Sequence, residues 1–274
     1  MIVRTEVSGV FNYLAEAIDG QVKYTQQPER SVLNLDARTL PVRDIRSMTS
    51  APTLEREGFM AAKLPLNVSG DDDPEQIATV YNPLLREFIA DLTGAQKIVL
   101  RPPIVRWSRR AKVEDAYARG PATYVHGDFS QKAFHEMAAE AVSDDPDGEH
   151  WLAGRYSVIQ TWRALTPPPQ DFPLALLDRR TVGREELIDL RTINGGPGRE
   201  QAYWNYSLKY NDAHQWYYCS DMTNDDVLVF IGSESTTEMP GILHSSFDNT
   251  ALGQHATPRI SCELRAFVYW GDAA

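Results

Sequence analysis

The sequence predicts a mainly β fold with flanking helices, arranged as a barrel or a double-sheet jelly roll. After Gly94 the chain consists of short segments rich in β-branched and aromatic residues, such as KIVLRPPIVRWS, RYSVIQTWRAL and DVLVFIGSES, separated by Gly, Pro, Asp and Asn. Many short strands with few helices do not give the alternation that a βαβ fold requires. We expect one domain over 1–274, with 1–95 as helical and strand support and 96–274 as the jelly-roll core.

Two segments have helical periodicity. The first follows SGDDDPEQ, where Asp73 can cap the helix and Pro74 can occupy its first position. Pro83 lies inside this pattern, so we expect either a kink or two consecutive helices, ending at Gly94. The apolar positions of the pattern are Ile77, Val80, Tyr81, Leu84, Leu85, Phe88, Ile89 and Leu92. The second helix is expected after Ser130, with a stripe made of Phe134, Met137, Ala138 and Ala141.

The composition favours a folded protein that acts on small molecules. Basic and acidic residues number 27 and 38, which gives a formal net charge of −11. A surface this acidic repels phosphate backbones and anionic lipid, and we therefore expect neither nucleic acid nor membrane partners. A local basic pocket could still bind an acidic small molecule. Two cysteines, no apolar stretch of roughly 20 residues and no secretory leader in the sequence predict a cytoplasmic protein. The glycine-rich GGPGRE segment lacks a phosphate-loop lysine and is expected to be a loop.

The segment YVHGDFS at 124–130 carries a candidate metal site. Side chains two apart on a strand point to the same face, so His126 and Asp128 would project together, along with Tyr124. Gly127 would face the other way and allow close packing. One imidazole and one carboxylate are two of the three ligands in the facial triad of non-haem Fe(II) oxygenases. The tripeptide alone is a weak signal, because a surface strand or a simple His–Asp hydrogen bond explains it equally well.

The triad needs a second histidine downstream, on another strand. His135 falls on the predicted helix and His150 in a charged loop, which leaves His214, His244 and His255. His244 precedes the RISCELR segment by a length that allows one loop and a return to the adjacent strand, whereas His255 would share its turn. His214 begins an aromatic strand and is expected to be packed or to face substrate. We therefore select His244.

The RISCELR segment can supply an anchor for 2-oxoglutarate. Arg259 and Ser261 lie two apart, so a guanidinium and a hydroxyl could reach one carboxylate from the same strand face. Arg265 is an alternative anchor, because it lies on the same face. We expect Glu263 to neutralise Arg265 and to leave Arg259 free.

In combination, these motifs resemble the AsaB/CmcJ-like family of non-haem iron, 2-oxoglutarate-dependent oxygenases. The resemblance rests on VHGDFS, TWRAL with DFPLALLD, HQWYYCSDM, HSSFDN and PRISCELRAFV in this order, and it covers nearly the whole chain. It implies a double-stranded β-helix, or jelly roll of cupin type. It also implies that His126, Asp128 and His244 bind Fe(II), that Arg259 with Ser261 holds 2-oxoglutarate, and that O₂ is consumed in a hydroxylation or desaturation of a natural-product intermediate.

Other residues and other functions stay open from the sequence. Tyr124, Arg163 and Trp216 could contact a substrate, but a structural role explains Tyr124 and Arg163 equally well, and aromatic barrel core is the commoner explanation for Trp216. One alternative is an iron oxidase or cyclase that does not use 2-oxoglutarate. Another is a non-catalytic, cupin-like small-molecule binding protein. The substrate, the position oxidised and the oligomeric state are not encoded in any motif.

Overall fold

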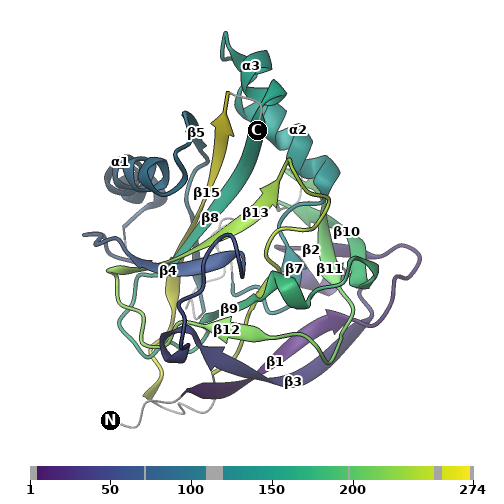
Figure 1. The fold of residues 1–274 in the computed structure, drawn as a ribbon. Coiled ribbons are helices and arrows are strands. Elements are labelled where there is room, and N and C mark those ends of the chain that lie inside the picture. Colours follow the sequence, from purple (N-terminus) through teal and green to yellow (C-terminus); the bar gives the residue numbers. More distant parts are fainter. Residues whose placement is uncertain (1–4, 71, 109–119, 197, 250–254, 272–274) are drawn as a thin grey trace.

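The computed structural model describes residues 5–70, 72–108, 120–196, 198–249 and 255–271. In these ranges two β-sheets pack against each other, and three α-helices lie outside them (Figure 1). Within the described residues, no helix is long and apolar enough to cross a membrane.

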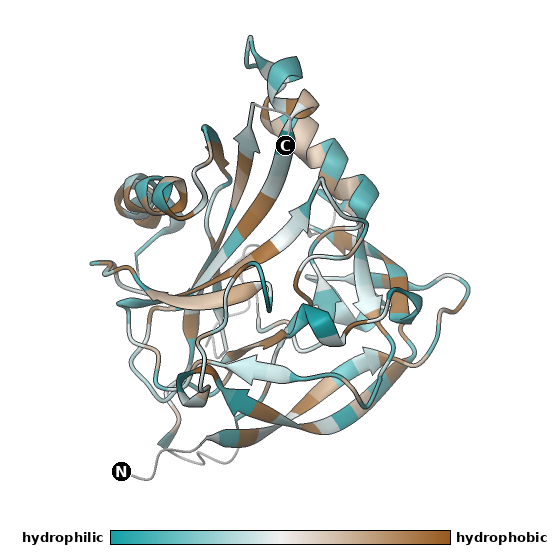
Figure 2. Cartoon of the chain, viewed as in Figure 1, coloured by the Kyte–Doolittle hydropathy of each residue, from teal (hydrophilic) through white to brown (hydrophobic). Residues whose placement is uncertain are grey.

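The larger sheet has nine strands, and the short strands at its centre carry the candidate metal ligands. Their order is β1-β3-β12-β9-β14-β7-β11-β10-β2. The bounds are β1 Glu6–Leu14, β2 Val22–Tyr24, β3 Leu35–Asp44, β7 His126–Gly127, β9 Leu174–Leu177, β10 Leu187–Asn194, β11 Gln201–Leu208, β12 Trp216–Tyr218 and β14 His244–Ser246. Figure 2 shows hydrophobic and hydrophilic residues alternating along β1 and β3, as expected of strands with one buried face.

The smaller sheet has the order β4-β13-β8-β15-β5, and β6 pairs with the start of β15. Its strands are β4 Phe59–Lys63, β5 Lys97–Leu100, β6 Ile104–Trp107, β8 Arg155–Ala164, β13 Asp226–Glu234 and β15 Ile260–Trp270. A hydrophobic core between the sheets includes Trp162, Phe230 and Leu176. This two-sheet arrangement resembles a jelly roll, as the sequence predicted.

Three α-helices cover the sheets. Helix α1 (Pro74–Thr93) packs Ile77, Tyr81 and Leu85 on the outer face of the smaller sheet. Helix α2 (Gln131–Ala141) buries Phe134 and Ala138 against β8 and β15, and α3 (Gly148–Ala153) follows it (Figure 1). The described residues also form the 3₁₀ turns η1 Pro28–Arg30, η2 Ile45–Ser47, η3 Arg179–Thr181 and η4 Arg184–Glu186.

The predicted caps of the first helix are confirmed. The Asp73 carboxylate accepts from the backbone N–H groups of Glu75 and Gln76, and Gly94 ends the helix in the left-handed region at φ 64°. The alternative of two consecutive helices is wrong, because one helix runs through Pro83. The described part of GGPGRE is the loop between β10 and β11, as predicted.

Residues 6–63 supply β1, β2 and β3 to the larger sheet and β4 to the smaller one. The N-terminal segment thus extends both sheets through strand pairing. The division into a support region and a jelly-roll core stays a prediction.

Candidate metal centre

The two short central strands bring the candidate ligands together. His126 of β7 and His244 of β14 are directly paired antiparallel neighbours, so their side chains lie on the same face of the sheet. Asp128 follows two residues after His126 and projects to that face. Its Oδ1 lies 3.7 Å from Nε2 of His126 and 3.8 Å from Nε2 of His244. One ligand atom from each of the three residues lies within 4.8 Å of the other two.

Backbone carbonyls fix the orientation of both imidazoles. Nδ1 of His126 lies 2.9 Å from the carbonyl of Tyr124, and Nδ1 of His244 lies 3.0 Å from the carbonyl of Ile242. A carbonyl only accepts, so each Nδ1 carries the proton and each Nε2 keeps its lone pair for a ligand bond. Burial, assisted by His244, lowers the pKa of His126 to about 3, which favours the neutral imidazole that a metal requires.

The carboxylate of Asp128 is oriented by two partners on its other oxygen. Arg265 donates to Oδ2 from Nε at 2.9 Å and from Nη2 at 2.6 Å, and Gln160 donates to the same oxygen. Oδ1 is left directed at the two imidazoles. Burial alone would raise the pKa of Asp128, but the adjacent guanidinium of Arg265 outweighs it and holds the pKa well below its usual range.

The inner face of β15 carries alternating charges from the metal ligands toward the start of the strand. Arg265 lies 3.6 Å from Glu263, whose main partner is Arg106 of β6, at 3.0 and 3.1 Å. The expectation that Glu263 neutralises Arg265 is therefore only partly right, because the shortest contacts of Arg265 go to Asp128. Arg265 therefore orients the Asp128 carboxylate.

Arg259 has donors to spare at the far end of this row. It is 1% exposed, and Nη1 donates to the hydroxyl of Ser261 at 2.7 Å. Its Nε and Nη2 have no hydrogen-bond partner among the described residues. Burial and the charge of Arg106 lower the pKa of Arg259 to about 9. A buried guanidinium that lacks an acceptor is costly, so this group suits an anionic ligand.

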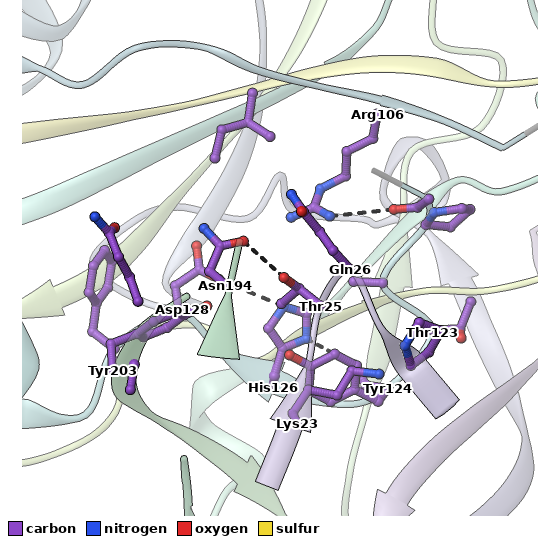
Figure 3. A pocket seen from close by; sticks show the side chains of 18 of the residues that line it. Lys23, Thr25, Gln26, Arg106, Thr123, Tyr124, His126, Asp128, Asn194 and Tyr203 are labelled. Carbon is purple, nitrogen blue, oxygen red and sulfur yellow. Dashed lines mark hydrogen bonds and ion pairs between the residues drawn. The ribbon is translucent and has the colours of Figure 1, made fainter. Parts of the chain in front are cut away.

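A cavity of about 700 Å³ opens beside the metal ligands (Figure 3). His126 and Asp128 form part of its wall, and the ring of Tyr124 stacks on His126 with a centroid distance of 4.4 Å. The cavity is therefore suited to hold a small molecule against the candidate metal position. Its remaining described lining includes Lys23, Thr25, Gln26, Ile104, Arg106, Phe129, Met137, Asn194, Tyr203 and Arg265.

Two residues expected to contact a substrate lie elsewhere. Arg163 follows Gln160 by three positions on β8, so it projects to the opposite face, where it donates to two backbone carbonyls and lies over Tyr81 of α1. Trp216 pairs with Leu177, the neighbour of the residue paired with His244, and so it also faces away from the ligands. It stacks on Phe11 as core.

The remaining histidines take structural positions. His214 is packed, which is one of the two roles expected from the sequence. Its ring stacks on Tyr13, and its Nε2 lies 2.9 Å from the carboxylate of Glu186. His135 is exposed on α2, as predicted. His150 lies in α3 rather than in a loop, because a short helix forms within the charged segment. Gly127 is not needed for close packing, since a Cβ there would meet Leu243 at an ordinary 3.6 Å.

Three residues of the site were missed by reasoning from the sequence. Gln160 and Arg106 reach it through strand pairing with β15, opposite Arg265 and Ser261 respectively. Lys23 reaches the cavity from β2, which joins the sheet beside β10. Pairing between strands that are distant in sequence has no local signature, whereas the two-residue spacing of His126 and Asp128 does.

The donor set fits a ferrous ion and a dicarboxylate. Two neutral imidazoles and one carboxylate oxygen, all buried and directed at one region, form the facial set typical of non-haem Fe(II). Arg106 and Arg265 pair with the carboxylates of Glu263 and Asp128, and the guanidinium of Arg259 adds a third positive charge. The excess positive charge and the vacant donors of Arg259 are suited to an anionic cosubstrate.

Known proteins with similar sequences are named as an Fe(II)-dependent dioxygenase and as hydroxylase/desaturases. The chain is 25% identical over 201 residues to the Fe(II)/2-oxoglutarate-dependent dioxygenase nvfI of Aspergillus novofumigatus, which covers 73% of this chain and 70% of the relative. It is 27% identical to the hydroxylase/desaturase efuI of Hormonema carpetanum, over 97% of this chain and 96% of the relative. The hydroxylase/desaturase asaB of Aspergillus flavus is 28% identical, over 72% and 96%. The resemblance inferred from the motifs is confirmed.

The fold and the family follow from two further comparisons. Two solved structures of the iron and alpha-ketoglutarate-dependent endoperoxidase NvfI, one with a different conformation, match with TM-scores of 0.82 and 0.77 at 21% and 22% identity. The matches cover 98% and 97% of this chain and 100% and 98% of those chains, which confirms the predicted fold. A family model described as YDMC, oxidoreductase/YMDC permease-like domain, spans residues 11–269, and the chain therefore belongs to this oxidoreductase family.

Proposed function

We propose that this protein oxidises a small organic molecule in a reaction that depends on Fe(II), 2-oxoglutarate and O₂. His126, Asp128 and His244 would hold the iron, and Arg259 with Ser261 would hold the distal carboxylate of 2-oxoglutarate. The observation that carries the proposal is the convergence of three ligand atoms on one region. Oδ1 of Asp128 lies 3.7 Å from Nε2 of His126 and 3.8 Å from Nε2 of His244. NvfI, one of the relatives named above, carries the same two dependences in its name.

The unpartnered donors of Arg259 favour 2-oxoglutarate over an oxidase that takes all its electrons from the substrate. An oxidase of that kind takes no dicarboxylate cosubstrate and would need a buried cation only for an anionic group of its substrate. Here a guanidinium with two vacant donors is buried at the residue before β15, the strand that carries Arg265, the orienting partner of Asp128. A dicarboxylate would satisfy those donors and lower the cost of burying the charge.

When bound, iron with 2-oxoglutarate supplies the oxidising chemistry: O₂ oxidises the cosubstrate to succinate and CO₂ and, in the same cycle, oxidises the substrate by hydroxylation or desaturation. The residues of this chain bind and orient the reactants and exclude water. The carbonyls of Tyr124 and Ile242 hold both imidazoles in the ligating tautomer. Arg265 keeps Asp128 ionised and its Oδ1 directed inward. The cavity holds the substrate against this centre.

Succinate release tests the proposal. The purified chain is loaded anaerobically with Fe(II) and 2-oxoglutarate, given candidate organic substrates and then exposed to air. Succinate formed in proportion to oxidised substrate is the expected result. Substrate oxidation without succinate would indicate the oxidase reading. Tight binding of substrate with no iron bound would indicate a binding protein.

A further inference from the structure

From the cavity lining, and resting on the proposed function, we infer that the substrate is an organic acid whose anionic group pairs with Lys23. The side chain lines the cavity from β2, and its Nζ lies 5.0 Å from the centroid of the Tyr124 ring. That same ring stacks on His126 (Figure 3). One aromatic ring therefore separates the ammonium from a candidate iron ligand. An anion held at Lys23 would place its attached carbon skeleton along this ring, toward the metal position.

Lys23 differs from the other two cations of the cavity wall. Arg106 is paired with Glu263, and Arg265 with Asp128. Among the described residues, Lys23 has a cation–π contact with Tyr124 and no carboxylate partner. It is partly buried, and burial lowers the pKa of its ammonium group. A neighbouring carboxylate would act in the opposite direction, so the charge is uncompensated within the described chain.

The carboxylates of the described wall do not serve Lys23. The wall contains two of them, those of Asp128 and Glu140. Asp128 is held by Arg265 at 2.6 Å, and Glu140 pairs with Arg101 at 3.1 Å. A ligand carboxylate or sulfonate would supply the missing counter-charge, and a charge-assisted hydrogen bond in a partly buried site is stronger than one in water.

The rest of the cavity specifies the body of this acid. Apolar side chains line it together with the charged groups, namely Leu33, Leu35, Ile104, Phe129 and Met137. Neutral polar groups are interspersed, among them Thr25, Gln26, Asn194 and Gln201. A cavity of about 700 Å³ accommodates a molecule of drug size. The wall thus fits an acid with a largely apolar skeleton and a few oxygen functions. The net charge of −11 makes this local attraction for an anion a property of the cavity rather than of the surface.

A matched pair of dyes tests the pairing without turnover. 8-Anilinonaphthalene-1-sulfonate has an apolar body and one sulfonate, and N-phenyl-1-naphthylamine has the same body without charge. Both are titrated by fluorescence into the full chain in saturating 2-oxoglutarate, so that Arg259 is not the group being probed. Lys23→Met is expected to lower the affinity for the anionic dye by about tenfold or more and the affinity for the neutral dye by less than about twofold. Lys23→Arg should restore most of the affinity for the anionic dye.

The control for charge is Lys132→Met on α2, whose side chain is 81% exposed. This substitution changes the net charge equally and should leave both dyes unaffected. Circular dichroism establishes that each variant is folded. Unchanged affinity for the anionic dye in Lys23→Met would overturn the inference. An equal loss of affinity for both dyes would also overturn it, and so would a loss in Lys132→Met as large as that in Lys23→Met.

Displacement extends the test to the ligand class. Carboxylic acids should displace the anionic dye more strongly than their methyl esters in the wild-type chain, and Lys23→Met should abolish that preference. Because this readout requires no iron and no O₂, its result is independent of the proposed oxidation. A preference for acids in a chain that forms no succinate would leave the inference standing and reject the oxygenase.

Discussion

At the scale of single residues, the site depends on which atoms are already engaged. Both Nδ1 atoms are satisfied by carbonyls, and the Oδ2 of Asp128 is satisfied by Arg265 and Gln160. The atoms without such partners are the two Nε2 atoms and Oδ1, which face one another. The surrounding hydrogen bonds therefore select the ligating atoms before any metal arrives.

Removal of a ligand should abolish iron binding. We expect that His126→Ala or Asp128→Ala eliminates stoichiometric Fe(II) and all succinate release, because two donors cannot form the facial set. Calorimetric titration and metal analysis measure the loss, with circular dichroism to establish folding. Gly127→Ala is the matched control, since its Cβ makes an ordinary contact at 3.6 Å. Retained turnover in either ligand variant would refute the metal assignment.

Arg265 of β15 and Arg259, the residue before this strand, should separate by phenotype. Arg259→Gln is expected to raise the 2-oxoglutarate concentration needed for half-maximal succinate release by about 10- to 100-fold, because charged hydrogen bonds are lost. Iron affinity should be unchanged, and the melting temperature should not fall, since an uncompensated buried cation has been removed.

Arg265→Gln should act on iron instead, lowering its affinity by about 10- to 100-fold, because Asp128 loses its orienting partner. Arg101→Gln is the control, because its partner Glu140 is exposed. A steep 2-oxoglutarate requirement in Arg265→Gln with none in Arg259→Gln would mean that the anchor is Arg265.

At the scale of elements, the sequence predicted what depends on neighbours in the chain. Helix α1 begins at its predicted cap and ends at its predicted glycine, because both signals act within one turn. The common face of Arg259, Ser261, Glu263 and Arg265 also follows from strand periodicity. The sequence left Arg163 and Trp216 open between substrate contact and a structural role, because the face of a residue relative to a distant strand depends on register, which neither local sequence encodes.

The inner face of β15 is stabilised by one carboxylate between two guanidinium groups. Glu263 and Arg106 have side chains 18% exposed, so solvent screens their attraction only partly. Glu263→Gln leaves both cations without this anion and should destabilise the fold by about 3–5 kcal/mol at pH 7. Glu140→Gln, at the exposed pair with Arg101, should change stability little.

The pH dependence of this loss has a defined sign. Burial raises the pKa of Glu263, but Arg106 and Arg265 outweigh it, so the pKa of the folded state is lowered. The stabilisation is fully present above the unfolded-state pKa of about 4.3 and is lost as the pH falls through the folded-state value. The gap between wild type and Glu263→Gln in thermal melts should therefore be constant from neutral pH to about pH 5 and narrow below it. A gap that widens in acid would contradict the ion-pair account.

At the scale of the whole molecule, the ligands come from strands far apart in sequence that meet only in the folded chain. β7 and β14 are two and three residues long, and each is held in place by a longer neighbour, β11 on one side and β9 on the other. The unfolded chain has no such arrangement. A metal ion that binds here should therefore stabilise the fold by mass action.

Thermal melting under anaerobic conditions measures that stabilisation. Fe(II), or redox-inert Mn(II), at about 100 times its dissociation constant should stabilise the wild-type chain by about 2.7 kcal/mol, because it binds the folded state selectively. For a chain of this size the melting temperature should rise by about 5 °C. His244→Ala should show no rise, since one of the paired imidazoles is missing, and a chelator should reverse the wild-type rise. An equal rise in His244→Ala would place the metal elsewhere on the chain and remove the basis for assigning His126, Asp128 and His244 as its ligands.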